Sequence, residues 1–436
     1  MVFLFTNCQP NFNRGTVVLP ITAKSVLSKS FPGAKFFIYI PFDDEYRQWY
    51  EGMTIVELPY IRVRKASRWV ARFRVITTIL RLATWFFFTR LFGVEPTILL
   101  NRPDLKALHE CDIVIDLGGD TVSEEYGWNT LLLHFLPLLS ASLFRKPVVA
   151  YSQSMGPFRR WKWLAKPLFK IFDLIILREK ASIETLKSVN YQGPFQCTAD
   201  TGFCLETASE NRIREIATQE KFGLSKPYVV LNVSPMTSFF YQKLSPRAKF
   251  SCYYKVMASA IDKIIEAADR DCLLVAHVTG GNSEVDDRFS AREVVESCKH
   301  SARIHCVQGE YSPSEIKGII SHADAMVGAR MHANIAALSS FVPTIAVSYS
   351  QKFSGIMALC GQEKWVLSIH ELDNEELFEM FTRLWEARTE IKRDLAERIP
   401  EVERLAASNG KILAHWYKAY TKANRHRNQY HTRLKS

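Results

Sequence analysis

The residues best suited to chemistry lie where a predicted strand runs directly into a helix. Residues 324–328 form the predicted strand, and Ala329-Arg-Met-His332 leads into the apolar helix 333–338. Arg330 and His332 therefore lie at a helix N-terminus, where backbone N–H groups and the helix dipole favour an anion. The guanidinium of Arg330 adds a planar fork of donors that matches a phosphate or a carboxylate.

A lysine follows the next predicted strand, 343–347, in a short polar loop. Parallel strands of an open α/β sheet deliver their following residues to one edge, so Lys352 is expected near Arg330 and His332. The three side chains predict an anion site. The alternative is structural, with Arg330 paired to a carboxylate such as Asp324 and His332 serving only as a capping residue.

A second candidate site follows the strand 113–117, which ends in Gly118-Gly119-Asp120. Glycines allow a ligand to approach the backbone, so Gly118 and Gly119 are candidate substrate-binding residues, although a lone Gly-Gly-Asp is a weak signal. Asp120 is a candidate catalytic carboxylate. Its alternative is an Asx turn or a helix N-cap.

Arg178 follows the predicted strand 174–177 and is a third candidate cation for substrate binding. The alternative for Arg178 is a structural pair with Glu179 or Asp200.

These residues are positioned by strands that alternate with helices, which is typical of an α/β protein with mostly parallel sheets. The predicted strands are 2–6, 35–40, 55–58, 113–117, 148–151, 174–177 and 195–198, then 228–233, 272–277, 303–307, 325–327 and 344–347. The helix 211–222 and the turn 223–227 separate the two series. The sequence therefore predicts two tandem Rossmann-like doubly wound domains, 1–210 and 223–370, with ligands at the carboxyl ends of the strands.

Residues 371–436 are predicted to form C-terminal helices, broken or kinked at Pro400, with a basic tail. The tail is interpreted as a solvated end and not as a nucleic-acid-binding arm.

Composition narrows the class of protein further. Of 436 residues, 47% are hydrophobic and 23% charged, which is enough apolar material for packed cores. The 56 Lys and Arg residues exceed the 45 Asp and Glu residues, and the net charge of +11 favours anionic partners. The nine cysteines form no C-x-x-C pair, which indicates reduced thiols in the cytoplasm and no metal site. The common nucleotide-binding, zinc-protease and hydrolase motifs are absent from the sequence, so no cofactor is expected.

Residues 59–90 are basic and aromatic. They contain eight Lys or Arg residues and no Asp or Glu, interleaved with Trp and Phe, and residues 158–170 have the same character. The arginines leave no uncharged stretch near the ~18 residues that a membrane span requires, so we predict that this segment does not span. One interpretation is a helix lying on an anionic membrane surface. The other is an ordinary surface helix with extended Arg and Lys side chains.

Taken together, several motifs resemble the polysaccharide pyruvyl transferase family. The motifs are Asp116-Leu-Gly-Gly-Asp120, Ser152-Gln-Ser-Met-Gly-Pro157, Leu177-Arg-Glu-Lys-Ala-Ser182, Ala199-Asp200, Gly328-Ala-Arg-Met-His-Ala333 and 343–352. Near the N-terminus the family usually has an Asn-x-Gly-Asp turn, and here Asn13-Arg-Gly-Thr16 keeps the turn but lacks the aspartate.

The resemblance implies a glycosyltransferase-B-like enzyme that transfers a pyruvyl (carboxyethylidene) group from phosphoenolpyruvate to a sugar, forming a pyruvate ketal. The acceptor would be a polysaccharide or its lipid-linked precursor. The cysteines indicate that the enzyme works in the cytoplasm, and the membrane-surface interpretation of the basic stretches would place it peripherally at the cytoplasmic face of the membrane. Under the pyruvyl transferase interpretation Arg330 and Lys352 bind the phosphate, and Arg178 binds the carboxylate or the phosphate. His332 donates the proton and Asp120 is the candidate base.

Two other functions fit parts of the sequence. A sugar-nucleotide-dependent glycosyltransferase of the same architecture would use Arg330 and Lys352 for the diphosphate, but the sequence identifies no pocket for the nucleobase. A membrane-surface scaffold would use the basic stretches alone and would leave Arg330 and His332 unexplained.

Overall fold

The computed structural model describes residues 1–8, 12–40, 44–58, 68–280, 282–349 and 351–433, with the backbone alone for 44–46, 68–72, 351–352 and 424–433. The chain forms two compact units, which we describe separately. The first comprises Met1–Gln9, Leu19–Thr201 and Arg404–Ser436, and the second comprises Pro10–Val18 and Gly202–Glu403. The sequence analysis placed its first boundary after residue 210 and did not expect the N-terminal segment 10–18 to belong to the second unit.

The first unit is built on a seven-stranded sheet in which all neighbouring strands are parallel. Its strand order is β3-β2-β1-β4-β5-β6-β7. The central strands are apolar and buried along their whole length, as expected when helices cover both faces of a parallel sheet. The strands are β1 (Val2–Thr6), β2 (Lys35–Ile40), β3 (Thr54–Glu57), β4 (Ile113–Asp116), β5 (Val148–Gln153), β6 (Leu174–Leu177) and β7 (Phe195–Cys197).

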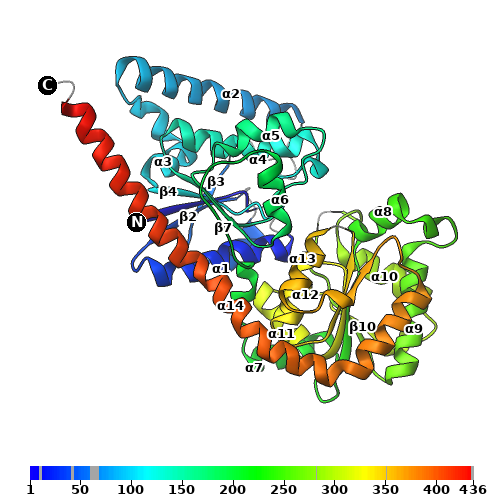
Figure 1. The fold of residues 1–436 in the computed structure, drawn as a ribbon. Helices are drawn as coiled ribbons and strands as arrows, with labels where there is room; N and C mark the ends of the chain where they lie inside the picture. The colour runs from blue at the N-terminus through cyan, green and yellow to red at the C-terminus, as the bar shows by residue number, and fades with distance from the viewer. Residues whose placement is uncertain (9–11, 41–43, 59–67, 281, 350, 434–436) are drawn as a thin grey trace. The chain divides into compact units, whose positions relative to one another are not determined.

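Helices α2, α4 and α5 contribute to a single apolar core in the first unit, with α2 outermost (Figure 1). Leu82 and Trp85 of α2 pack in the same core as Phe135 of α4 and Phe169 of α5. The helices of this unit are α1 (Arg14–Ser30, whose first turn counts with the second unit), α2 (Arg68–Phe87), α3 (Pro103–Glu110), α4 (Trp128–Leu143), α5 (Lys162–Phe169) and α6 (Ala181–Ser188).

The second unit repeats the same architecture with a six-stranded parallel sheet of order β10-β9-β8-β11-β12-β13. Its strands are β8 (Tyr228–Asn232), β9 (Cys272–Leu274), β10 (Ile304–Cys306), β11 (Ala323–Gly328), β12 (Thr344–Ser348) and β13 (Val366–Ser368). The sequence analysis did not predict β13, because three residues are too few to show a period of two.

The start of α11 shows how the local sequence begins a helix in the second unit. Ser312 and Glu315 form a capping box there. The helices are α7 (Glu210–Glu220), α8 (Pro235–Leu244), α9 (Tyr253–Ala268), α10 (Asp287–Ser297), α11 (Pro313–Ser321), α12 (Met331–Leu338) and α13 (Gln351–Leu359).

The C-terminal helical segment is confirmed. Of the two alternatives predicted at Pro400, a break or a kink, the break is wrong. Helix α14 (Asn374–Arg433) continues through Pro400, and the predicted basic tail is part of this helix up to Arg433. Proline removes one backbone hydrogen bond from a helix. Here its neighbours Leu395, Ile399 and Val402 are buried, so apolar packing maintains the helix across that position.

Both sheets have the doubly wound strand order, so the predicted fold class is confirmed. In each sheet the order reverses once, between β1 and β4 in the first unit and between β8 and β11 in the second. Ligands of open α/β sheets bind outside the carboxyl ends of the strands at such a reversal. The residues that follow β8, β9 and β11 are therefore the candidate functional residues of the second unit.

Within the described residues, one helix is long and apolar enough to cross a membrane by length and composition alone. It covers Phe73–Phe92, and 17% of its most apolar stretch is buried. The sequence analysis excluded a span here because of the arginines. However, the stretch from 75 to 92 contains only Arg81 and Arg90, so the charge count by itself does not exclude one.

Candidate active site

Arg330 lies immediately before α12, at the carboxyl end of β11. Its Nη2 donates to Oδ1 of Asp287 at 2.7 Å, and its Nε donates to the same oxygen at 3.2 Å. Burial alone would lower the pKa of Arg330, but the charge and hydrogen bonds of Asp287 raise it above its usual value. The guanidinium is therefore charged and held in one orientation.

The partner of Arg330 differs from the one that the sequence suggested. Asp324 forms ion pairs with Arg270 at 3.0 Å and Lys392 at 3.7 Å. Asp287 takes its place beside Arg330 and is separated from it by more than forty positions in the chain.

Asp287 is a buried hub, with 1% of its surface exposed. Its Oδ2 accepts the backbone N–H groups of His277 and Val278, both at 3.0 Å. Asp287 therefore fixes the loop after β9 with one oxygen and Arg330 with the other. The adjacent Asp286 caps α10, since its carboxylate accepts the N–H of Arg288 at 2.9 Å. An aspartate before a helix is a common local signal for a helix start, and it does not mark a site by itself.

His277 follows β9 and is completely enclosed, with 2% of its surface exposed. Among the residues that the structure describes, neither of its ring nitrogens has a hydrogen-bond partner. Burial and the nearby positive groups of His332, Arg14 and Arg330 hold its pKa well below the usual value. The imidazole is therefore neutral and offers one donor and one acceptor. Both ring nitrogens are therefore open to a partner that the described chain does not supply, such as a water or a ligand.

The N-terminal segment of the second unit completes this arrangement. The N–H of Arg14 donates to the carbonyl of His277 at 2.9 Å, and Asn13 forms an antiparallel bridge with Val278. Gly15 lies against His332, because a β-carbon at position 15 would be 2.6 Å from Nδ1 of that imidazole. Only glycine permits this approach, which explains why the Asn-x-Gly part of the turn is kept here.

Arg14 itself is buried, with 1% of its side chain exposed. Its Nε donates to the carbonyl of Tyr311 at 2.8 Å, and its Nη2 pairs with Oε2 of Glu310 at 2.5 Å. Thr279 donates to the same carboxylate at 2.6 Å. Although burial would raise the pKa of Glu310, the hydrogen bonds from Thr279 and Arg14 and the charge of Arg14 lower it, so Glu310 is ionised.

We call Arg14, Arg330 and His332, together with the neutral imidazole of His277, the cation cluster. Its members come from three segments far apart in the sequence and lie within one unit. Two arginines held by carboxylates beside a neutral imidazole can bind an anion and hydrogen-bond to it. The sequence analysis named Arg330 and His332 but missed Arg14, His277 and the hub Asp287.

In the first unit, Gly118 and Gly119 form a turn over a buried polar network. Asp116 lies within 2.9 Å of Nε2 of His134, and Nδ1 of His134 lies within 2.7 Å of Oγ1 of Thr121. A β-carbon on Gly118 would be 2.3 Å from Cε1 of His134, so the glycine makes room for this imidazole. His134 was not predicted, because it lies inside the apolar helix α4.

Asp120, the predicted base, is half-buried just after this turn. The hydroxyl of Tyr126 donates to its Oδ2 at 2.6 Å. The tyrosine orients the carboxylate, while the role of Asp120 as a base stays a prediction.

Arg178 is also in the first unit, whereas Arg330 and His332 are in the second. Its Nη1 donates to Asp200 at 2.7 Å, its Nε donates to Ser154 at 2.8 Å, and 1% of its side chain is exposed. These contacts favour the alternative in which Arg178 forms a structural pair. A direct contact with substrate stays a prediction.

The side chain of Lys352 lies outside the described residues. Its backbone forms the second position of α13, directly after the carboxyl end of β12. Within the described part of the chain, no group of three or more His, Cys, Asp or Glu side chains could hold a metal ion.

Comparison with known proteins identifies the family. A family model described as polysaccharide pyruvyl transferase matches residues 13–351, more than three quarters of the chain. The chain belongs to the polysaccharide pyruvyl transferase family. The match begins at Asn13 and covers every member of the cation cluster. Membership identifies the protein as a transferase of polysaccharide biosynthesis that acts on a saccharide.

A curated relative supports this assignment. The amylovoran biosynthesis protein AmsJ of Erwinia amylovora is 24% identical over 307 residues, which are 68% of this chain and 71% of the relative.

Solved structures show the same glycosyltransferase-B type of fold. The UDP-GlcNAc 2-epimerase of Neisseria meningitidis, bound to UDP-GlcNAc, has a TM-score of 0.61 at 10% identity, over 96% of this chain and 99% of that one. HepE of Anabaena, in complex with UDP and glucose, has a TM-score of 0.56 at 13% identity, over 96% and 99%. At these identities the likeness concerns the fold alone.

Proposed function

We propose that this protein transfers a pyruvyl (carboxyethylidene) group from phosphoenolpyruvate to a sugar of a polysaccharide or of its lipid-linked precursor. The product is a pyruvate ketal. The observation that carries the proposal is the cation cluster at the carboxyl edge of the second sheet, inside the region matched by the family.

The charge of the cluster suits this donor. Phosphoenolpyruvate carries a phosphate and a carboxylate on a small skeleton, and Arg330 presents a guanidinium that Asp287 already orients. The neutral imidazole of His277 can donate one hydrogen bond to an anion without needing a proton from solvent. We propose that Arg330 and Lys352 bind the phosphate and that Arg14 supplies a further positive charge.

The proposed reaction needs one proton donor and one base. His332 protonates the methylene carbon, which leaves positive charge on the neighbouring carbon and its oxygen. A sugar hydroxyl attacks that carbon and loses its proton to Asp120. A second hydroxyl then attacks the same carbon and closes the ketal as the carbon–phosphate oxygen bond breaks, and its proton leaves on the departing inorganic phosphate. Arg330 stabilises the charge on the departing phosphate.

A second candidate function is a sugar-nucleotide-dependent glycosyltransferase. Two solved structures of similar fold favour it, because one contains UDP-GlcNAc and the other contains UDP and glucose. In that case Arg330 would hold a diphosphate. The two functions differ in donor, so they are separable by binding.

The test is to incubate the full-length protein with phosphoenolpyruvate and lipid-linked oligosaccharides, and to look by mass spectrometry for the added carboxyethylidene group. Phosphate release should accompany it. Thermal shifts with phosphoenolpyruvate and with a panel of sugar nucleotides run in parallel. A shift with a sugar nucleotide, together with a hexose added to the acceptor, would establish the glycosyltransferase instead.

We also propose that the protein works in the cytoplasm at the inner face of the membrane, beside a lipid-linked acceptor. All nine cysteines are free, in keeping with a reducing compartment.

A further inference from the structure

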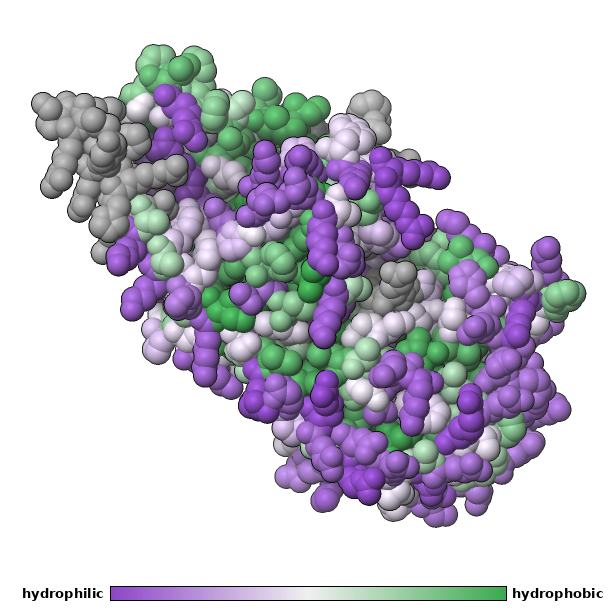
Figure 2. Space-filling view, in the orientation of Figure 1, coloured by the Kyte–Doolittle hydropathy of each residue, from purple (hydrophilic) through white to green (hydrophobic). Residues whose placement is uncertain are grey.

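Helix α2 and the turns after it expose an unusual amount of apolar surface. Eleven of the 22 exposed large hydrophobic residues in the described chain fall between positions 73 and 98. They are Phe73, Ile76, Ile79, Leu80, Phe86, Phe87, Phe88, Leu91, Phe92, Val94 and Ile98, and we call them the α2 surface. Figure 2 shows hydrophobic residues gathered over this helix. Contiguous exposure on this scale marks an interaction site.

The helix has two opposite apolar faces. Thr78, Leu82 and Trp85 are 2 to 4% exposed and face the body of the unit, where Trp85 stacks on Phe144 at 4.2 Å between ring centroids. Residues three and four apart share a helix face. Positions 73, 76, 80, 83 and 87 therefore form one stripe, on the side away from the buried face. The large apolar side chains of this stripe are exposed, whereas a helix that only packs on a core usually has polar residues on its outer face.

The charged side chains that the structure describes between positions 73 and 94 are all positive. They are Arg74, Arg81 and Arg90, and this stretch contains no Asp or Glu. Arg74 and Arg81 are exposed and lie one turn before Thr78 and Trp85, on the flank between the outward stripe and the body of the unit. Arg90 lies over the ring of Phe86, 5.8 Å from its centroid. Long side chains in this position can extend to the level of lipid phosphates while the stripe is buried in acyl chains.

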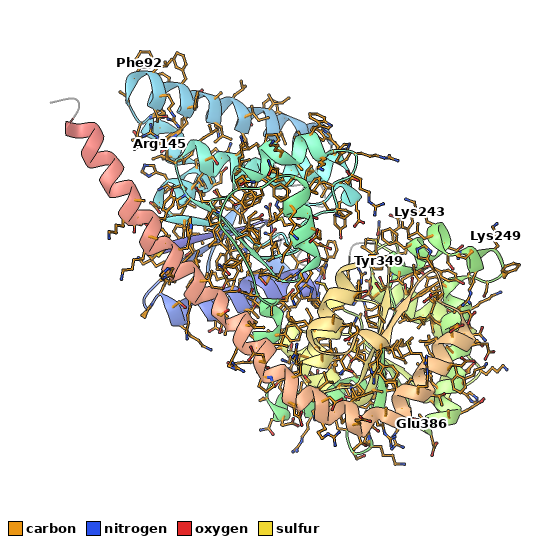
Figure 3. All side chains as sticks on the ribbon, in the orientation of Figure 1. Phe92, Arg145, Lys243, Lys249, Tyr349 and Glu386 are labelled. Atoms are coloured by element: carbon orange, nitrogen blue, oxygen red, sulfur yellow. The ribbon has the colours of Figure 1, made fainter. Side chains whose placement is uncertain are left out.

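The neighbouring helices α4 and α5 also expose large apolar side chains. Leu132, Leu133 and Leu139 of α4 are 41 to 50% exposed, and Trp163 of α5 is 73% exposed. Figure 3 shows Phe92 at the outer end of the apolar segment.

A hollow of about 540 Å³ adjoins α5. Its lining includes Arg160, Lys162 and Lys166 around Trp163. Its cations suit a phosphate-bearing head group.

From these features we propose that α2 lies in the interface of an anionic lipid bilayer. The outward stripe inserts shallowly, and the arginines on its flank contact lipid phosphates. This deepens the proposed function by naming the surface that would bring the transferase to a lipid-linked acceptor, but lipid binding can be tested without any activity.

The charge pattern distinguishes lipid from a second copy of the chain. A symmetric dimer through the α2 surface would bring Arg74, Arg81 and Arg90 against the same residues of the other copy, and α2 carries no acid to pair with them. A spanning arrangement conflicts with the packing of Leu82 and Trp85, since lipid would have to replace protein around the whole helix. An anionic surface satisfies both the apolar stripe and the arginines.

The experiment is co-sedimentation of the full-length protein with vesicles of phosphatidylcholine alone, or of phosphatidylcholine with phosphatidylglycerol, at low and high salt. We expect binding to the anionic vesicles at low salt and a steep loss at high salt, because the attraction is screened. Neutral vesicles should bind at least tenfold less.

Two variants test the two components. Arg74→Gln/Arg81→Gln/Arg90→Gln should lower the partition coefficient on anionic vesicles by about 10- to 100-fold. Phe73→Gln/Leu80→Gln/Phe87→Gln should lower it by at least as much, since these side chains supply the insertion. All six positions are exposed, so both variants should fold.

Matched controls in the second unit are Arg214→Gln/Lys226→Gln/Lys255→Gln and Phe239→Gln/Leu244→Gln/Phe250→Gln, which change equally exposed residues. They should bind like the wild type.

Three results would overturn the proposal. They are a wild type that fails to bind anionic vesicles at low salt, a wild type that binds neutral vesicles equally well, and a wild type that stays bound to the pelleted vesicles at high salt, as a protein with a spanning helix would. A wild-type dimer that the Phe73 variant dissociates, without vesicle binding, would show that a second copy covers the surface. Vesicle binding without pyruvyl transfer would leave this inference intact and overturn the proposed function alone.

Discussion

Asp287 connects two of the groups on which the proposed donor site depends. One oxygen holds Arg330, and the other holds the backbone at His277 and Val278. Removing its charge should leave a guanidinium without its ion-pair partner and loosen the loop that carries the buried imidazole. The effect on binding should therefore be larger than the effect on folding.

Asp287→Asn should raise KM for phosphoenolpyruvate about 10- to 100-fold, the range expected when a charged contact is misplaced. Steady-state phosphate release measures it. Asp262→Asn is the matched control, because Asp262 is also buried and accepts the backbone N–H groups of Lys299 and His300 in the same unit. Both variants should lower the melting temperature. Equal KM values in the two variants would contradict a positioning role for Asp287.

His277 should make the stability of the protein pH-dependent. Its folded pKa lies well below 6.5, so below that pH the unfolded chain takes up a proton that the folded chain refuses. Stability should then fall by about 1.4 kcal/mol per pH unit as the pH decreases below 6.5, and be unaffected by this group above it. Urea unfolding of the wild type and of His277→Gln between about pH 5 and pH 8 measures how the free energy of unfolding of each protein depends on pH. Parallel curves for the two proteins would show that His277 is not buried as a neutral group.

The site could be predicted only in part from the sequence, for a reason visible in single residues. Arg330 and His332 were found because the strand, the turn and the helix that position them are local. Arg14, His277 and Asp287 come from other segments, and only the strand order brings them to the same edge. Asp287 also resembles an ordinary helix start, which is what Asp286 beside it is.

At the scale of elements, the strands were the most predictable part. Twelve of the thirteen were expected, because buried parallel strands are continuous apolar runs. The elements that were not predicted correctly are short or depend on tertiary contacts. Strand β13 has too few residues to be recognised, and the continuity of α14 through Pro400 depends on packing. The exposure of the outward face of α2 could not be predicted either, since its apolar composition is equally typical of a core helix.

The Gly118 turn provides a test at this scale. Gly118→Ala places a methyl group 2.3 Å from Cε1 of His134 and 2.6 Å from Oγ1 of Thr121, so the network with Asp116 must shift. We expect a loss of about 1–3 kcal/mol in the free energy of unfolding, as for an overpacked core. Gly223→Ala is the control, because its nearest neighbour would be 3.9 Å away. An unchanged unfolding midpoint for Gly118→Ala would show that the turn has room to move.

At the scale of the whole chain, the proposed donor site joins segments that are distant in sequence. Phosphoenolpyruvate should therefore slow amide exchange together at 13–17, 277–287 and 328–334, all within the second unit, because ligand binding suppresses local opening. Hydrogen exchange with mass spectrometry measures this, and inorganic sulfate serves as a control for general anion binding. Protection confined to 160–166 would relocate the anion site to the basic hollow beside α5.

The N-terminal segment of the second unit also has a consequence for synthesis on the ribosome. Arg14 and Gly15 are made well before the groups they contact, because His277, Glu310 and His332 lie more than 250 positions further along the chain. The contacts of this segment therefore cannot form until the later residues have been made, after the first unit has begun to fold. A fragment that starts at Gly202 would therefore hold a complete six-stranded sheet and still lack one arginine of its own site, and an added peptide covering 10–18 should restore phosphoenolpyruvate binding to it.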